Sequence, residues 1–86
     1  MSGKQKQGGE NFLHDLLRQE VHLEFNGNRE VIIEECSGIL EYTDQQVRIN
    51  TPHFILRFQG RGLQLCTMTH DSIVLNGHID RLDFQF

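Results

Sequence analysis

The chain has 86 residues and a formal net charge of −4 at pH 7. This length fits a single domain. The negative charge and the scattered basic residues argue against nucleic-acid binding, and no apolar run approaches the roughly 20 residues that span a bilayer. A core of this size rarely supplies more than about 3–5 kcal/mol of net stability, so small domains often need disulfides, metal or oligomerisation as well.

Disulfides and metal are the less favoured of these three sources of stability. The first ten residues are polar and glycine-rich, with no apolar signal segment, so we expect a reducing cytoplasmic compartment. Cys36 and Cys66 are then interpreted as small, buried, apolar side chains, with a disulfide or a reactive thiol as the alternative. The five histidines and two cysteines form no pair at the spacing of a structural zinc site, so no metal is expected. Oligomerisation is the remaining candidate.

The N-terminal region divides into two parts. Residues 1–10 are expected to form a disordered tail, and residues 11–19 a short amphipathic helix. Four apolar residues of this helix share one face and are candidates for contacts: Phe12, Leu13, Leu16 and Leu17. A helix of two to three turns is not stable alone in water. It either docks on its own domain or serves as a segment for partner binding or self-association.

From Val21 onward, apolar and polar residues alternate with a period of two, as in half-buried β-strands. The pattern predicts about eight short strands, at residues 21–25, 30–35, 40–42, 47–49, 54–58, 63–65, 73–75 and 82–86. Residues 60–62 (GRG) and 76–77 (NG) are interpreted as hairpin turns. Ile79 is out of phase with the last strand, which predicts a bulge near Asp80 and Arg81.

The fold class that follows is all-β. Residues 20–86 are expected to form a small antiparallel meander curled into a sandwich or an open roll, preceded by the short N-terminal helix or disordered lead. Most strands are apolar on one face and polar on the other, so we expect one face of the sheet to be buried and the other solvated.

Some apolar residues break this alternation or lie in the closing strand, and these are the assembly candidates. They are Ile32, Ile39, Ile55, Val74, Phe84 and Phe86. The first four, if they lie together, would form a second apolar surface, which in so small a domain usually meets another subunit. The alternative is that the sheet folds over and buries both faces itself. The closing strand adds an edge that could pair with another chain.

No motif in the chain predicts catalysis. Glu34 and Glu35 are neighbours on a predicted strand, so they point to opposite faces and cannot act as a pair. His70 and Asp71 fit a turn. No helix follows residues 60–62 to bind a phosphate. We therefore predict a protein that is not an enzyme and has no catalytic, cofactor-binding or metal-binding residues; the minor alternative is a metal- or ligand-binding enzyme.

Three stretches of the sequence resemble a known family. They are GILEYTDQQVRINT (38–51), FQGRGLQL (58–65) and IVLNGHIDRLDF (73–84). Together they resemble the YabP/YqfC family of sporulation proteins, and their spacing fits the YqfC-like branch. The resemblance covers residues 20–86. The stretch TPHF (51–54) departs from the family pattern, because a Pro-His pair occupies a turn where simpler polar or glycine residues are expected.

The resemblance implies a protein of endospore-forming bacteria, made during sporulation in the cytoplasm of the mother cell. The family has no assigned enzymatic activity, so the resemblance supplies a process and not a mechanism. Our first hypothesis is a non-enzymatic sporulation protein that forms a homo-oligomer or binds a protein partner not identified by the sequence. The second is a small binding module that recruits a larger partner through its N-terminal amphipathic segment. Neither hypothesis involves nucleic acid or a transmembrane segment.

Overall fold

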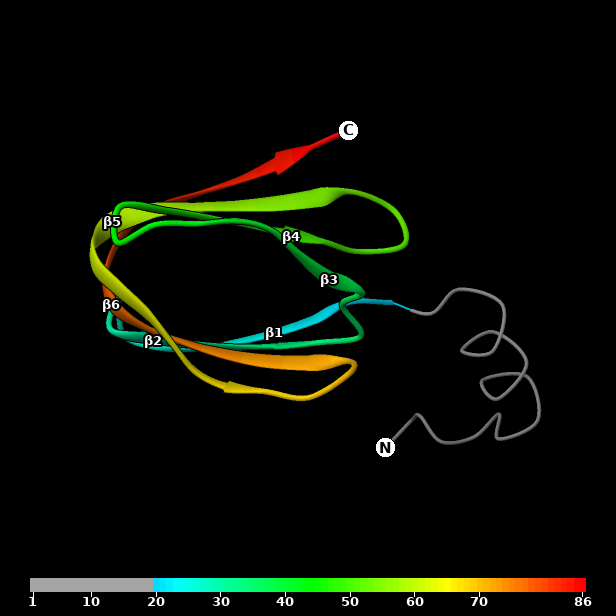
Figure 1. Cartoon of the computed structure of the whole chain (residues 1–86), viewed down its shortest axis with the longest axis horizontal. Coiled ribbons are helices and arrows are strands. Elements are labelled where there is room, and N and C mark those ends of the chain that lie inside the picture. Colours follow the sequence, from blue (N-terminus) through cyan, green and yellow to red (C-terminus); the bar gives the residue numbers. More distant parts are fainter. Residues whose placement is uncertain (1–19) are drawn as a thin grey trace, which may run out of the picture.

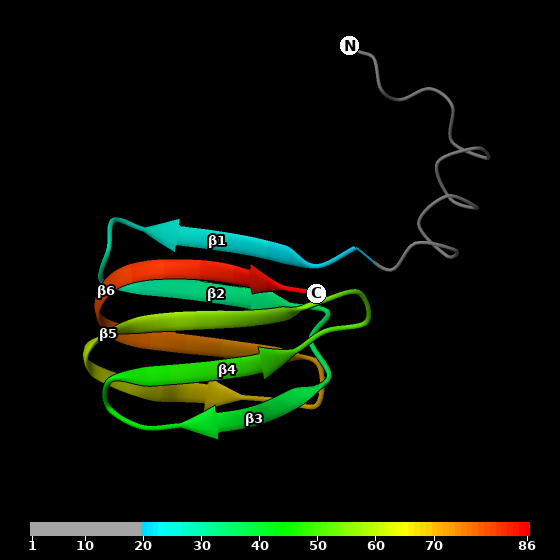
Figure 2. The same cartoon turned by 90° about the horizontal axis from the view of Figure 1, so that it is seen from above.

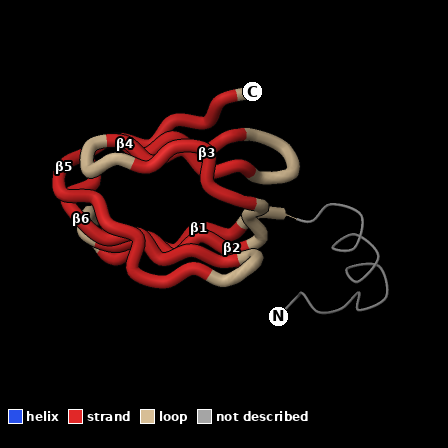
Figure 3. Tube along the Cα trace, in the orientation of Figure 1, coloured by secondary structure: helices blue, strands red, loops and turns tan. Residues whose placement is uncertain are grey.

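The computed structural model of the chain describes residues 20–86, and in this range it contains only β-strands, loops and turns (Figure 3). The six strands are β1 (His22–Asn26), β2 (Glu30–Glu34), β3 (Gly38–Tyr42), β4 (Gln46–Asn50), β5 (Ile55–Met68) and β6 (Ser72–Gln85). The prediction of an all-β fold is confirmed. The predicted tail (1–10) and amphipathic helix (11–19), with their four candidate contact residues, lie outside the described residues.

All six strands belong to one antiparallel sheet with the order β1-β2-β6-β5-β4-β3. Strands β3 to β6 form the predicted meander. The β1–β2 hairpin departs from it, because β2 pairs with β6 instead of β3. The two long strands, β5 and β6, form a central hairpin, and each of the shorter hairpins pairs with one of them.

The single sheet folds over itself into two layers (Figure 1). Both β5 and β6 pass from one layer to the other at a shared bend. Layer one contains β1, β2, the first half of β6 and the second half of β5. Layer two contains β3, β4, the first half of β5 and the second half of β6. The sequence-based expectation of a sheet curled into a sandwich therefore agrees with the observed arrangement.

Two of the predicted hairpin turns are wrong, because the chain bends at these positions and does not reverse. Residues 60–62 and 76–77 lie inside β5 and β6, so the number of strands is six and not eight. Glycine is needed there because the two backbones approach closely. A Cβ atom on Gly60 would lie 1.9 Å from the carbonyl oxygen of His78, and one on Gly77 would lie 2.6 Å from that of Gly62. Gly62 and Gly77 do have positive φ, of 59° and 132°, but they produce bulges and a sharp bend in continuous strands.

The bend is held by the turns of the two short hairpins. In the β1–β2 turn, the carbonyl of Arg29 accepts a hydrogen bond from the N–H of Gly77 at 3.1 Å, and the neighbouring carbonyl accepts one from Ile79. In the β3–β4 turn, the carbonyls of Gln45 and Asp44 accept hydrogen bonds from β5 in the same way. These hydrogen bonds give partners to backbone N–H groups at the bend, as peptide groups in a folded protein require.

The core lies between the two layers and is built from the inward-facing residues of both. Its fully buried members include Phe58, Ile33, Ile49, Leu56, Leu63, Ile73, Leu75, Val31 and Val47. Burying a side chain of this size stabilises the fold by about 1.5–3 kcal/mol. Cys36 also joins the core, and its burial raises the pKa of the thiol.

Two features of register decide where side chains point. In β6, Arg81 pairs with Gln59 and Ile79 with Gly60, so Asp80 is the extra residue of a bulge, and the bulge predicted near this position is confirmed. In β5, the register shift between Leu65 and Thr67 leaves Cys66 without a pairing partner on β6. Cys66 is exposed, so the prediction that both cysteines are buried is confirmed for Cys36 and wrong for Cys66.

Candidate interaction surfaces

The four residues expected to form a second apolar surface do not lie together. Ile32 and Val74 are direct cross-strand partners on the outer face of layer one, and both are half-buried. Ile55 lies on the outer face of layer two. Ile39 pairs with Ile49 and packs against the core, so its placement on the solvated face is wrong. A bulge between Ile39 and Glu41 changes the phase of β3, and the sequence alternation gave no sign of it.

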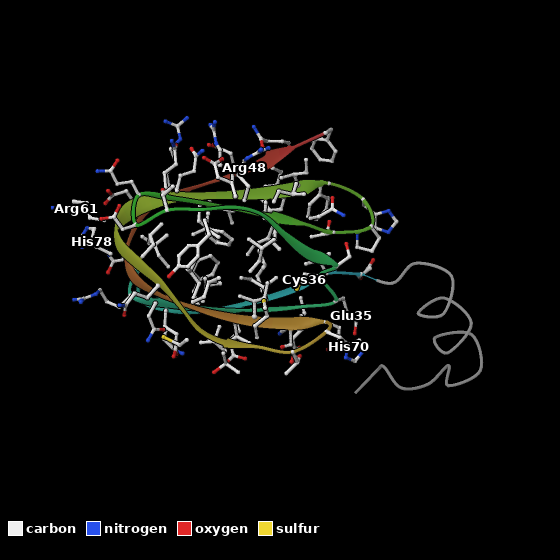
Figure 4. All side chains as sticks on the ribbon, viewed as in Figure 1. Glu35, Cys36, Arg48, Arg61, His70 and His78 are labelled. Carbon is white, nitrogen blue, oxygen red and sulfur yellow. The ribbon has the colours of Figure 1, made fainter. Side chains whose placement is uncertain are left out.

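The outer face of layer two is a polar surface with a cross-strand row of four charged side chains, in which two arginines lie between two carboxylates. In this row Glu41 Oε1 accepts a hydrogen bond from Arg48 Nε at 2.9 Å, and Asp83 Oδ2 accepts one from Arg57 at 2.8 Å. These arginine hydrogen bonds lower the pKa values of both carboxyl groups. Arg48 and Arg57 are themselves opposite each other in register, so the carboxylates flank two like charges. Figure 4 shows the labelled Arg48 on the outer face of this layer, among other outward-projecting polar side chains.

The sandwich has two open sides, where the edge strands of the two layers face each other without pairing. The first, the β3/β5 side, is formed by β3 and by residues 64–68 of β5. Its edges are linked across the layers, because the N–H of Leu65 donates a hydrogen bond to the hydroxyl of Tyr42 at 3.2 Å. Both edges also contain a bulge. Bulges and bridging contacts of this kind protect edges from pairing with other chains.

The second open side, the β1/β6 side, is formed by β1 and by residues 80–85 of β6 (Figure 2). Inward-facing apolar residues of both layers reach solvent here. On β1, Leu23 is half-buried against the core and Phe25 is 43% exposed. On β6, Leu82 is half-buried and Phe84 is 48% exposed. The sequence analysis missed Phe25, because its regular alternation with Leu23 is what a buried face produces; only the position of β1 at the sheet edge exposes it.

Aromatic rings gather at one end of this side. The ring centroid of Phe54 lies 5.0 Å from that of Phe84 and 5.8 Å from that of Phe86, both in edge-to-face geometry. Phe54 is positioned by the β4–β5 loop, in which the buried Thr51 hydroxyl accepts a hydrogen bond from the N–H of Phe54 at 3.1 Å. Phe86 is 96% exposed. Two of the predicted assembly candidates, Phe84 and Phe86, therefore lie in one cluster with a residue that the sequence analysis did not single out.

The edge at residues 80–85 carries charged side chains and one bulge, but no other strand covers it among the described residues. Strand β2 pairs only with the first half of β6, and the β1–β2 turn binds β6 no further than Ile79 among the described contacts. The edge contains no proline and no lysine, and its bulge at Asp80 stands at its beginning. Natural edge strands are commonly blocked by such residues or by bulges along their length. One edge of residues 80–85 therefore has no partner strand among the described residues.

The residues considered for catalysis are dispersed over the surface. His70 and Asp71 lie in the β5–β6 turn, with 3.9 Å between His70 Nε2 and Asp71 Oδ2. A second pair lies at the bend, where His78 Nε2 is 3.0 Å from Asp80 Oδ1. Figure 4 labels both histidines. Both members of each pair are at least partly solvent-exposed. Within residues 20–86 no group of three or more His, Cys, Asp or Glu side chains is placed to hold a metal ion. The same range contains no helix able to cross a membrane.

These features define a small, two-layered antiparallel sheet protein with two open sides, of which the β3/β5 side is bridged across the layers. The model of the YabP family matches residues 18–86, and the chain belongs to this family, which is associated with sporulation. Comparison with curated proteins and with solved structures found no match.

Proposed function

We propose that this protein acts in sporulation as a non-enzymatic assembly protein that associates with copies of itself in the mother cell. The observation that carries the proposal is the β1/β6 side, where two strand edges without partner strands and the exposed rings of Phe25 and Phe84 lie together. Apolar side chains next to an open sheet edge are a common basis of chain association.

The direct test is the size of the full-length protein in solution. Sedimentation velocity and light scattering, from tens to hundreds of micromolar, should show a concentration-dependent increase in mass. A strict monomer over this range would contradict the proposal. Localisation of a fluorescent fusion in sporulating cells then tests the compartment, since signal confined to the forespore would exclude action in the mother cell.

A second candidate function is a binding module that recruits a larger partner through residues 11–19. The feature that favours it is the sequence pattern of residues 11–19, in which four apolar residues are predicted to share one helical face. Deleting residues 1–19 separates the two functions. Self-association that persists while capture of a partner is lost favours the binding module; loss of neither favours assembly through the sheet alone.

A further inference from the structure

Strand β1 is the edge strand of layer one, and Figure 2 shows it as the outermost strand of the β1/β6 side. The N–H of Arg29 donates a hydrogen bond to the carbonyl of Asn26 at 3.3 Å, so the peptide groups of Asn26 point toward β2. Successive residues of a strand direct their peptide groups to opposite edges. The N–H and C=O groups of Leu23 and Phe25 therefore point to the open edge, where no strand of the described residues pairs with them.

The side chains of residues 21–25 are arranged symmetrically about Leu23. On the inner face, Leu23 has an apolar neighbour on each side, Val21 and Phe25. On the outer face it is flanked by two exposed side chains, the imidazole of His22 and the carboxylate of Glu24. A strand with this pattern is complementary to a second copy of itself turned end to end. Imidazole then meets carboxylate on the outer face, and apolar side chains meet on the inner face.

From this arrangement we infer that the protein forms a twofold dimer in which the β1 strands of two copies pair antiparallel with each other. The twofold axis is perpendicular to layer one and passes midway between the two Leu23 residues. Rotation about it reverses the strand and keeps the inner face inward, so layer one of both copies forms one continuous sheet. Such an interface is isologous and closes after two copies. The inference rests on the proposed function and specifies its geometry.

The register follows from the peptide groups and the side chains together. Residues opposite each other in an antiparallel pair direct their peptide groups alike, so the axis lies at a residue position and not between two positions. With the axis at Leu23, the two Leu23 residues exchange backbone hydrogen bonds. His22 then lies opposite Glu24, and Val21 lies opposite Phe25, each pair occurring twice. The ring of Phe25, 43% exposed in one copy, is thereby covered.

The other registers bring like charges together or pair fewer residues. An axis at Glu24 places the two Glu24 carboxylates opposite each other, and an axis at His22 places Glu24 opposite Glu20. Like charges directly across a strand pair destabilise a sheet. An axis at Phe25 shortens the paired segment, because it runs into the β1–β2 turn. The axis at Leu23 is therefore the favoured one.

The first experiment changes the charges on the outer face of β1 in the full-length protein, with the dimer Kd measured by sedimentation equilibrium. His22→Glu places carboxylates opposite each other twice and should raise the Kd by about tenfold or more. Glu24→Lys leaves the imidazole without its carboxylate and should also raise the Kd. The double variant H22E/E24K forms two carboxylate–ammonium pairs and should restore a Kd at or below that of the natural protein.

The matched control for the charge experiment is Asp44→Lys. Asp44 is exposed in the β3–β4 turn, away from β1, and its replacement changes the net charge as much as Glu24→Lys does. This variant should leave the Kd nearly unchanged. Far-UV circular dichroism verifies that each variant is folded.

The second experiment locates the contact by cross-linking two variants in a Cys66→Ser background, which removes the exposed native thiol. H22C and E24C proteins are mixed in equal amounts and then oxidised mildly. Directly opposite residues have Cα atoms within the range that a disulfide spans, whereas two copies of the same variant hold their thiols at diagonal positions, about 7–8 Å apart. The mixture should therefore give a disulfide-linked dimer on a non-reducing gel, and each variant alone should not.

The outcomes separate this inference from the proposed function. If the natural protein self-associates but the mixture does not cross-link, or H22E/E24K does not restore the Kd, the dimer geometry is wrong and assembly stands. Cross-linking of E24C alone would likewise overturn the geometry, because it requires an axis at Glu24. A natural protein that stays monomeric would overturn both and would indicate another occupant for the edge of β1.

Discussion

Replacing Gly77 with valine tests whether the close approach of β5 and β6 at the bend is essential. Gly77 has a φ of 132°, a value that a β-branched residue does not adopt without strain of about 1–3 kcal/mol. The new Cβ atom would also lie 2.6 Å from the Gly62 carbonyl oxygen and 2.9 Å from Leu63 Cα, both backbone atoms that cannot rotate away. Overpacking of this kind adds about 1–3 kcal/mol.

The two costs sum to about 2–6 kcal/mol, which is comparable to the whole net stability of a core this small. We expect Gly77→Val to lower the Tm by at least about 10 °C, or to be unfolded at room temperature. Urea and thermal unfolding followed by circular dichroism measure the change.

The matched control for this prediction is Gly27→Val. Gly27 also has a positive φ, of 59°, but no atom lies within 4 Å of its Cβ position. It therefore carries the backbone strain without the crowding. If Gly77→Val and Gly27→Val lose the same free energy of unfolding, crowding at the bend is not the reason for glycine at position 77.

Three further predictions follow from other contacts. Tyr42→Phe removes the acceptor that links β3 to β5 and should lower the free energy of unfolding by about 0.5–1.5 kcal/mol in urea titrations. The arginine hydrogen bonds that lower the pKa values of Glu41 and Asp83 stabilise the fold above the ordinary carboxyl pKa of about 4. This stabilisation should be lost as the pH falls through the lowered pKa values. Unfolding measured at a series of pH values should therefore show a weaker acid dependence in Asp83→Asn than in the natural protein. A thiol reagent should modify Cys66 in the native protein and Cys36 only after unfolding, because Cys36 is buried and its pKa is raised; equal native reactivity would contradict the structure.

The sequence predicts the fold class well because the period-two alternation is a local property of each strand. It also predicts the bulge at Asp80, since Ile79 is out of phase with the residues that follow. It does not predict the number of strands, because the stretches at Gly62 and Gly77 carry the same glycine signal whether the chain reverses or only bends. The choice between these outcomes depends on contacts with the two short hairpins, which are distant in sequence.

For the candidate surface, too, the sequence predicts features that depend on local pattern and fails for features that depend on the arrangement of the strands. The exposed aromatic residues Phe84 and Phe86 could be selected from the sequence because they lie in the closing strand. Phe25 could not, because its pattern is that of a core residue, and its exposure results from the position of β1 in the sheet order. Ile39 was assigned to the wrong face because a bulge, which has no clear sequence signal in this strand, shifts the phase of β3.

The β1/β6 side is open because of the topology of the sheet. A sheet folded into two layers by one bend necessarily has two sides at which the layers end. On the β3/β5 side the hydroxyl of Tyr42 connects the layers and bulges interrupt both edges. On the β1/β6 side the inward-facing residues alternate up to the edge, so core-type side chains such as Phe25 and Phe84 reach water. The proposed self-association would cover these side chains and so add to the stability of a chain with few core residues. If the proposed self-association is coupled to folding, the Tm of the natural protein should rise with its concentration in thermal unfolding followed by circular dichroism.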